Sequence, residues 1–224
     1  MFGSSVDSYD SVTKFRSTLK GDHVTGIILA GGKGRRIATN KAFLTVGNRP
    51  IIADTIDTLR SLFNEILIIT NNPGAYSSLD VKKVKDIIPG KGPLGGLYTG
   101  LTFSKTVHSY VVACDMPFLN PALINYMLEQ RDGFDVIVPQ SVVGLEPLHA
   151  IYSKNCIEPI LRRLDNGDLK VQSFFGEVKV KYIRQSEIER FDPELKTFFN
   201  INYREDLHKV KTFLNIEDTK PWGD

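Results

Sequence analysis

Short apolar runs alternate with longer stretches of mixed apolar and polar residues from Val24 onward. Four of the apolar runs have the length of a buried strand: VTGIILA (24–30), EILIIT (65–70), SYVVACD (109–115) and DVIVPQ (135–140). The segments between them are typical of helices: PIIADTIDTLRSLF (50–63), LGGLYTGLTF (94–103) and NPALINYMLEQ (120–130). Strands that alternate with helices at this spacing predict a parallel sheet covered by helices on both faces.

The pattern becomes less regular after Pro147. There we expect strands at LHAIY (148–152) and VKVKYIR (178–184), and helices at NCIEPILRRLDNG (155–167) and YREDLHKVKTFL (203–214). The whole pattern predicts an α/β fold, a three-layer αβα sandwich of the Rossmann-like type. Its sheet is mostly parallel, with antiparallel strands added to one edge by the second half of the chain.

Turn chemistry supports the helix boundaries. Pro50 and Pro121 stand where a first helical turn would begin, and Asn120 is a suitable N-cap for the helix that starts at Pro121. Residues 1–22 are rich in Ser, Asp, Thr and Lys without a helical or strand period, so we interpret them as a tail outside the core. No linker divides the remainder, and residues 23–224 are predicted to form a single domain.

Composition excludes several classes of protein. A hydrophobic share of 42% and a charged share of 24% are those of an ordinary globular chain, and a net charge of +2 gives no general reason to bind nucleic acid. No apolar run approaches the roughly 20 residues of a membrane helix, and the N-terminus lacks the apolar centre of a secretory signal. We therefore expect a cytoplasmic protein without membrane contact. Cys114 and Cys156 suggest neither a disulfide framework nor a zinc site, and both are expected to be buried.

The stretch GIILAGGKGRRIATNKAF (26–43) is the main candidate for chemistry. Glycines that follow a strand place main-chain N–H groups in an open turn at the carboxyl edge of the sheet, where they attract anions. The turn is neither a dinucleotide fingerprint, because Ile37 stands where that pattern needs Gly, nor a Walker A loop. Four cations follow the strand: Lys33, Arg35, Arg36 and Lys41. The alternative is a solvated loop in which the glycines merely turn the chain.

These residues resemble the signature of the nucleotidyltransferases that share the nucleotide-sugar pyrophosphorylase fold. The positions in register are Leu29, Ala30, Gly31, Gly32, Arg36 and Lys41, whereas Ala38 stands where those enzymes usually have Gly. Among them the chain is most similar to the molybdenum cofactor guanylyltransferase family. The second Gly of LAGG and the GPLGG segment (92–96) favour that branch over the related cytidylyltransferases.

Two further segments match the same family. GPLGG, with Asp86 upstream, resembles the segment that contacts the guanine base, which implies nucleotide-binding roles for Asp86, Gly92 and Pro93. The alternative is that the segment serves tight helix packing. Asp115 ends an apolar strand before Met116 and Pro117 and resembles the family's metal motif. One carboxylate beside a phosphate site is a natural ligand for Mg²⁺, so Asp115 is the predicted metal ligand.

The remaining candidates concern the acceptor and the nucleotide. Glu146 and His149, in GLEPLHAIY, resemble a segment on the pterin side, although a histidine in this position could equally belong to the core. Asn200 and Asn202 match an Asn-x-Asn motif, and Asn202 could instead cap the last helix. Asn71 and Asn72 stand at the end of the 65–70 strand. Of these two residues, Asn72 is the predicted nucleotide contact. Arg162 and Arg163 could meet an acceptor phosphate or form a solvated helix face.

The resemblance implies a Mg²⁺-dependent transfer of GMP from GTP to the phosphate of molybdopterin, with release of pyrophosphate. Arg36, Lys41 and Asp115 would then be the catalytic residues, acting by charge neutralisation and positioning. It also allows transient contact with other cofactor-biosynthesis or acceptor proteins. Two alternatives stay open: a related enzyme that uses CTP or a sugar or polyol phosphate, and a nucleotide-binding subunit without catalysis.

Overall fold

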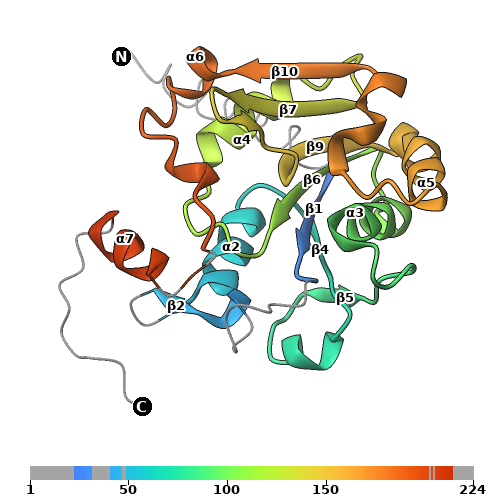
Figure 1. Ribbon diagram of the computed structural model, residues 1–224. Helices are drawn as coiled ribbons and strands as arrows, with labels where there is room; N and C mark the ends of the chain where they lie inside the picture. The colour runs from blue at the N-terminus through green and yellow to red at the C-terminus, as the bar shows by residue number, and fades with distance from the viewer. Residues whose placement is uncertain (1–22, 32–40, 47–48, 202, 204, 214–224) are drawn as a thin grey trace, which may run out of the picture.

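The computed structural model describes residues 23–31, 41–46, 49–201, 203 and 205–213, with the side chains of Lys41, Val46, Leu207 and Lys211 left out. Its centre is one sheet with the strand order β10-β7-β9-β6-β1-β4-β5, and β8 pairs with β7 outside this path (Figure 1). The strands are β1 (Val24–Leu29), β4 (Glu65–Ile69), β5 (Lys82–Val84), β6 (His108–Ala113), β7 (Val136–Ser141), β8 (Gly144–Leu145), β9 (His149–Ser153) and β10 (Val180–Arg184).

The sheet is mostly parallel, as the sequence predicts. β1 pairs in parallel with β4 and β6, β4 with β5, and β7 with β10. β9 is antiparallel to both of its neighbours, β6 and β7. The expected antiparallel strand is therefore present, but it lies inside the sheet and not at an edge. All five of its residues are buried, whereas the edge is formed by β10, where Lys181 and Arg184 suit an exposed position.

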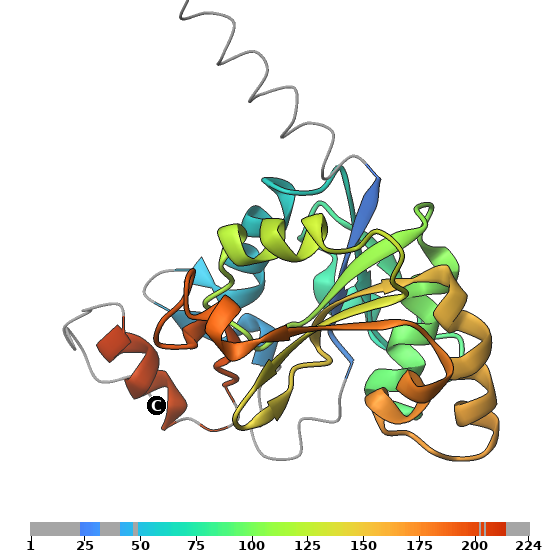
Figure 2. The ribbon, with the colours of Figure 1, turned by 90° about the horizontal axis from the view of Figure 1, so that it is seen from above.

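Helices cover both faces of the sheet, which completes the three layers (Figure 2). α2 (Ile51–Arg60) and α4 (Pro121–Glu129) lie on one face, and α3 (Gly92–Phe103) and α5 (Ile157–Asp165) on the other. The shorter elements are η1 (Lys41–Phe43), β2 (Thr45–Val46), β3 (Arg49–Pro50), η2 (Pro73–Tyr76), η3 (Lys154–Cys156), η4 (Val171–Glu177), α6 (Gln185–Ile188), η5 (Lys196–Phe198) and α7 (Asp206–Phe213). None of the described helices has the length and apolar character needed to cross a bilayer.

β1 divides the hydrophobic core between the two faces. Its residues are all buried, and successive side chains point to opposite faces of a strand. Val24 and Ile28 pack in the cluster under α2 and α4, whereas Ile27 and Leu29 pack in the cluster under α3 and α5. A strand that is buried on both faces needs an almost continuous apolar run, which explains the sequence VTGIIL.

The predicted helix starts agree with the structure. The Asn120 side chain accepts hydrogen bonds from the N–H groups of Ala122 and Leu123, at 2.9 and 3.1 Å, and α4 begins at Pro121. α2 begins directly after Pro50. Cys114 and Cys156 form no disulfide with each other, and Cys156 is buried as predicted, whereas Cys114 is only partly buried. Residues 1–22, predicted to be a tail, lie outside the described residues.

Glycine lets α3 approach β1 closely. A Cβ atom at Gly100 would lie 2.9 Å from both Cδ1 and Cγ2 of Ile27. Ile27 is fully buried, and its β-branched side chain has few alternative rotamers, so the clash could be relieved only by moving the helix.

Gly100→Val should therefore lower the free energy of unfolding by about 2 kcal/mol or more, because it overpacks the interface between α3 and the sheet. Thr102→Val adds a valine to the exposed face of the same helix and is the matched control, with an expected change within about 0.5 kcal/mol. Urea unfolding curves measure both. Equal stabilities of the two variants would contradict the close packing of α3 on β1.

Candidate active site

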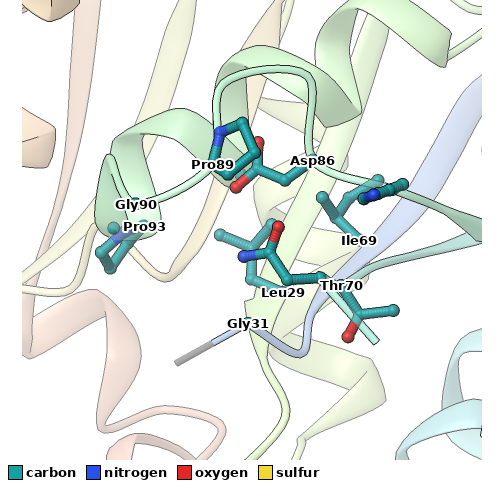
Figure 3. A pocket seen from close by; sticks show the side chains of 12 residues that line it. Leu29, Gly31, Ile69, Thr70, Asp86, Pro89, Gly90 and Pro93 are labelled. Carbon is teal, nitrogen blue, oxygen red and sulfur yellow. The ribbon is translucent and has the colours of Figure 1, made fainter. Parts of the chain in front are cut away.

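A cavity of about 750 Å³ opens at the carboxyl ends of β1, β4 and β5, beside the first turn of α3. Figure 3 shows Asp86 and Pro89 across this space from Leu29 and Gly31. The lining residues are Leu29, Gly31, Ile69, Thr70, Asn71, Lys85, Asp86, Pro89, Gly90, Gly92, Pro93 and Gly96. Five of the residues predicted to bind a nucleotide are therefore brought together here: Leu29, Gly31, Asp86, Gly92 and Pro93.

The register of the parallel strands sets the row of residues at this edge. Leu29 in β1 is paired with Ile69 in β4 and with Ala113 in β6. The second residue beyond each of these three is Gly31, Asn71 or Asp115. Because strands in a sheet lie about 4.8 Å apart, the three paired residues span roughly 10 Å across the sheet, and Gly31, Asn71 and Asp115 follow them in the same order.

The register corrects the choice between the two asparagines. Asn71 lines the cavity, and its Nδ2 atom lies 3.9 Å from the position of a Cβ atom built on Gly31. Asn72 is not among the lining residues. Its N–H donates to Thr70 Oγ1 at 3.2 Å, and the residue precedes η2. The nucleotide contact predicted for Asn72 fits Asn71 better. The sequence shows both asparagines, but it does not show the strand register that places one of them at the cavity and not the other.

Main-chain hydrogen bonds fix the end of β1 from several sides. The N–H of Ala30 donates to Ile69 O at 2.9 Å, and Leu29 O accepts from the N–H of Cys114 at 3.2 Å. The Tyr76 hydroxyl donates to Ala30 O at 3.2 Å. Ala30 itself does not line the cavity but connects the buried strand to Gly31, which is exposed. These hydrogen bonds hold the end of β1 in place, directly before Gly31.

Asp86 connects the loop after β5 to α3. It is mostly buried, and its Oδ1 atom accepts a hydrogen bond from Thr99 Oγ1 at 2.7 Å. The N–H of Ile87 donates to the same hydroxyl oxygen at 3.0 Å. Thr99 was not identified from the sequence, because it lies within an apparently apolar helix. The other carboxylate oxygen of Asp86 has no hydrogen bond within the described residues, which leaves an acceptor at the cavity wall.

The start of α3 gives the cavity a wall of main-chain atoms. Gly92 has a φ of +63°, a left-handed conformation that glycine adopts without strain, and Pro93 follows in the first turn. Because Gly90, Gly92 and Gly96 in this wall have no side chain, a flat ring could approach the backbone closely. The N-terminal end of a helix also favours acceptor atoms and negative charge.

Asp115 lies two residues beyond the end of β6 and is partly buried. Its carbonyl oxygen accepts a hydrogen bond from the N–H of Ile201 at 3.0 Å, which brings Asn200 to the same edge. Within the described part of the chain, no three His, Cys, Asp or Glu side chains form a metal-binding cluster. A single carboxylate is nevertheless a fitting donor set for Mg²⁺ when substrate phosphates and water complete the coordination.

Three phenylalanine rings hold the 199–201 segment against the loop after Asp115. Phe118 lies 6.1 Å from Phe199 and 5.6 Å from Phe213 of α7, and Phe199 lies 5.6 Å from Phe213, measured between ring centroids. Aromatic pairs at these separations contribute about 0.5–1.5 kcal/mol beyond the area they bury. No motif in the sequence indicates this cluster, since its members lie far apart along the chain.

Glu146 lies on the other side of Asp115, in the loop that enters β9. Its N–H donates to Pro139 O in β7 at 3.0 Å, and Leu148 O accepts from the N–H of Ala113 in β6 at 3.1 Å. Burial raises the pKa of the Glu146 carboxyl to about 7. A partly desolvated carboxyl group in this position could hydrogen-bond a ligand either as donor or as acceptor.

His149 lies inside the core, contrary to a direct role in substrate binding. The residue has no exposed surface, and its Nε2 atom lies 3.0 Å from Thr197 Oγ1. Its ring packs at right angles to Tyr110, with the centroids 5.4 Å apart. Burial lowers the pKa of His149 to about 4, so the ring is neutral at pH 7. Of the two interpretations left open by the sequence, the structure supports the core histidine.

Several predicted positions need separate mention. Gly32, Arg36, Ala38 and Asn202 lie outside the described residues, and Lys41 is described by its backbone alone, in η1. Arg162 and Arg163 both pair with Glu177, at 2.6 and 2.5 Å. These pairs hold α5 against η4, so the two arginines serve the fold in this structure.

Comparison with known proteins assigns a family. A family model described as MobA-like NTP transferase domain matches residues 26–181. A molybdenum cofactor guanylyltransferase from Desulfosudis oleivorans is 36% identical over 192 residues, which covers 85% of this chain and 95% of that protein. A protein named "Probable molybdenum cofactor guanylyltransferase" from Pelotomaculum thermopropionicum is 38% identical over 187 residues, covering 84% and 91%.

A solved structure has the same fold. The crystal structure of molybdopterin-guanine dinucleotide biosynthesis protein A from Archaeoglobus fulgidus matches with a TM-score of 0.76 and 23% identity. The match covers 87% of this chain and all of that one. The mostly parallel sheet and its two helical layers are therefore a fold that this chain shares with that protein.

The raised pKa of Glu146 predicts how the free energy of unfolding depends on pH. Folding raises the pKa of Glu146 from 4.5 to about 7. The contribution of this group to the free energy of unfolding is therefore fully present below pH 4.5 and is lost as the pH rises through 7. Glu146→Gln cannot ionise, so its stability relative to the wild type should improve by about 1–2 kcal/mol between pH 4.5 and pH 8, after discounting for partial exposure.

Urea unfolding across this pH range measures the difference. His149 contributes the opposite slope, because its lowered pKa gives stability that is lost as the pH falls from 6.5 towards 4, but this contribution is common to both proteins and cancels. The exposed Glu158→Gln is the matched control. A stability difference for Glu146→Gln that does not vary with pH would show that the carboxyl group is not desolvated.

Proposed function

Because the chain belongs to the MobA-like NTP transferase family, we propose that it transfers GMP from GTP to the phosphate of molybdopterin. The reaction would form molybdopterin guanine dinucleotide and release pyrophosphate. The enzyme class, nucleotidyltransferase, follows from the family itself. The specific donor and acceptor are proposals, supported chiefly by the cavity of about 750 Å³ between β1, β4, β5 and α3.

The guanine nucleoside is proposed to occupy this cavity. Guanine offers two adjacent N–H donors and one carbonyl acceptor on its edge. Asp86 and the carbonyl groups of the loop after β5 supply acceptors, and the main-chain amides and Lys85 supply donors. Asn71 would contact the ribose or a phosphate group. From the cavity, the triphosphate would extend across the end of β1 towards Asp115.

The acceptor is proposed to approach from the opposite side. Glu146 lies in the loop that enters β9, the strand next to β6, and Asn200 precedes Ile201, whose N–H donates to Asp115 O. In this arrangement the molybdopterin phosphate attacks the α-phosphorus in line with the departing pyrophosphate. Asn202, by resemblance to the family, would help to orient the acceptor.

The chemistry asks for positioning and charge neutralisation more than for a nucleophilic side chain, as in other phosphoryl transfers. Asp115 would hold Mg²⁺, which neutralises phosphate charge when bound. Arg36 and Lys41, by resemblance, would stabilise the negative charge that develops on the phosphates. Backbone groups at Leu29, Ala30, Gly31 and Gly32 would position the nucleotide.

The choice of nucleotide can be tested by thermal shift. A ligand that binds only the folded state raises its stability in proportion to RT ln(1 + [L]/Kd), so GTP with Mg²⁺ at about 100 times its Kd should add about 2.7 kcal/mol. ATP, CTP and UTP at the same concentration are the controls. A larger shift with CTP would favour a cytidylyltransferase. Binding of GTP without release of its pyrophosphate, in the presence of either molybdopterin or phosphorylated sugars, would favour a subunit without catalysis.

The metal role of Asp115 can be tested by substitution. Asp115→Asn preserves the shape of the side chain but weakens its affinity for a divalent cation, so turnover should fall by about 100-fold or more, a loss of about 2.7 kcal/mol of transition-state stabilisation. Asp132→Asn, at an exposed loop position, is the matched control. Rates of pyrophosphate release over a Mg²⁺ titration measure the effect. Full activity of Asp115→Asn would remove the metal assignment.

A further inference from the structure

Tyr76 is buried beneath the edge that carries the cavity, although no motif includes it. Only 1% of the residue is exposed, and it belongs to the core cluster on the α2 and α4 face. Its hydroxyl donates to the carbonyl oxygen of Ala30 at 3.2 Å. Its ring packs on Phe43 of η1, with the centroids 5.2 Å apart. The side chain therefore connects η2, the end of β1 and η1.

The Ala30 carbonyl shares a peptide plane with the N–H of Gly31. In a planar trans peptide the C=O and N–H bonds point in opposite directions. Because Tyr76 holds the carbonyl towards the core cluster, the Gly31 N–H points away from that cluster. Gly31 is exposed and lines the cavity, and within the described residues its N–H donates no hydrogen bond. This donor is thus available to a ligand.

We propose that Tyr76 is a positioning residue, whose hydroxyl orients the Ala30–Gly31 peptide so that the Gly31 amide can donate a hydrogen bond to the bound nucleotide. The hydroxyl itself does not touch the ligand. The inference rests on the proposed function only for the identity of the nucleotide. Asn71 Nδ2 lies 3.9 Å from the position of a Cβ atom built on Gly31, so a second donor is close to this residue.

The hydrogen bond has no evident substitute. A buried carbonyl that loses its donor remains unsatisfied or turns towards water. If this carbonyl turned, the whole peptide plane would rotate. The Gly31 N–H would then no longer point away from the core cluster. The main-chain hydrogen bond from Ala30 N–H to Ile69 O would remain, because it belongs to the preceding peptide. The expected damage is local to one peptide and leaves the sheet intact.

Tyr76→Phe removes only the hydroxyl and keeps the ring on Phe43. The Kd of GTP with Mg²⁺, measured by calorimetry, should rise by about tenfold, the effect of one lost hydrogen bond to a charged or polar ligand. KM should rise in parallel while kcat stays within about twofold, because the amide holds the substrate and the transition state alike. Tyr182→Phe removes a hydroxyl from the partly exposed Tyr182 in β10 and is the matched control, with unchanged Kd.

A measurement without nucleotide keeps the inference separate from the proposed function. In ¹H–¹⁵N spectra of the free protein, the Gly31 amide signal should shift in Tyr76→Phe and stay in place in Tyr182→Phe. A wild type that binds no GTP would contradict the proposed function but not this shift. A Tyr76→Phe variant that is less stable yet binds GTP with unchanged Kd, or that leaves the Gly31 signal in place, would reduce Tyr76 to a packing residue and overturn the inference.

Discussion

The pairing of β1 with a strand on each side is the constraint on which the rest of the structure depends. The strand is hydrogen-bonded to β4 and β6 and buried on both faces, so its carboxyl end has no freedom to shift. Everything at the edge is positioned relative to that end. The parallel register carries Gly31, Asn71 and Asp115 to one level, and the glycines of α3 let the helix pack closely beside them. A site assembled in this way owes its geometry to main-chain hydrogen bonds more than to side-chain contacts.

The antiparallel strand β9 brings a loop of a second kind to the sheet edge that carries the cavity. Parallel strands present only their carboxyl ends at this edge, so every loop there leads away from a strand. β9 runs the other way, and the loop that enters it, with Glu146, therefore lies at the same edge as Asp115. Its interior position keeps this loop between β6 and β7, away from the cavity at the ends of β1, β4 and β5. An antiparallel strand at the outer edge, as the sequence suggested, would have placed the loop farther from Asp115.

The sequence predicts the layers and most of the strands because apolar runs of this length have few alternatives. It also identifies the residues at strand ends, such as Asp115, since a polar residue after a buried strand marks the edge of the sheet. Register and burial are less accessible. The choice of Asn71 over Asn72 depends on pairing between β1 and β4, and the burial of His149 depends on Thr197, a partner 48 positions away. Thr99 and the three phenylalanines carry no local signal, because each acts through a contact between distant segments.

The described part of the site contains few charges for a ligand as anionic as a nucleoside triphosphate. Lys85 is the only cation among the described lining residues, and Asp86 offsets it. The rigid frame thus supplies directional donors, such as the Gly31 amide and the Asn71 side chain, while most of the positive charge in this region of the sequence belongs to Lys33, Arg35, Arg36 and Lys41.

Hydrogen bonds from a fixed backbone select the position and orientation of a ligand, whereas charge strengthens its binding without much directional preference. A main-chain amide is common to every residue type, so a frame of this kind depends on keeping the peptide orientation and not on keeping particular side chains. The Tyr76 side chain holds the Ala30–Gly31 peptide in one orientation through its hydrogen bond to Ala30 O.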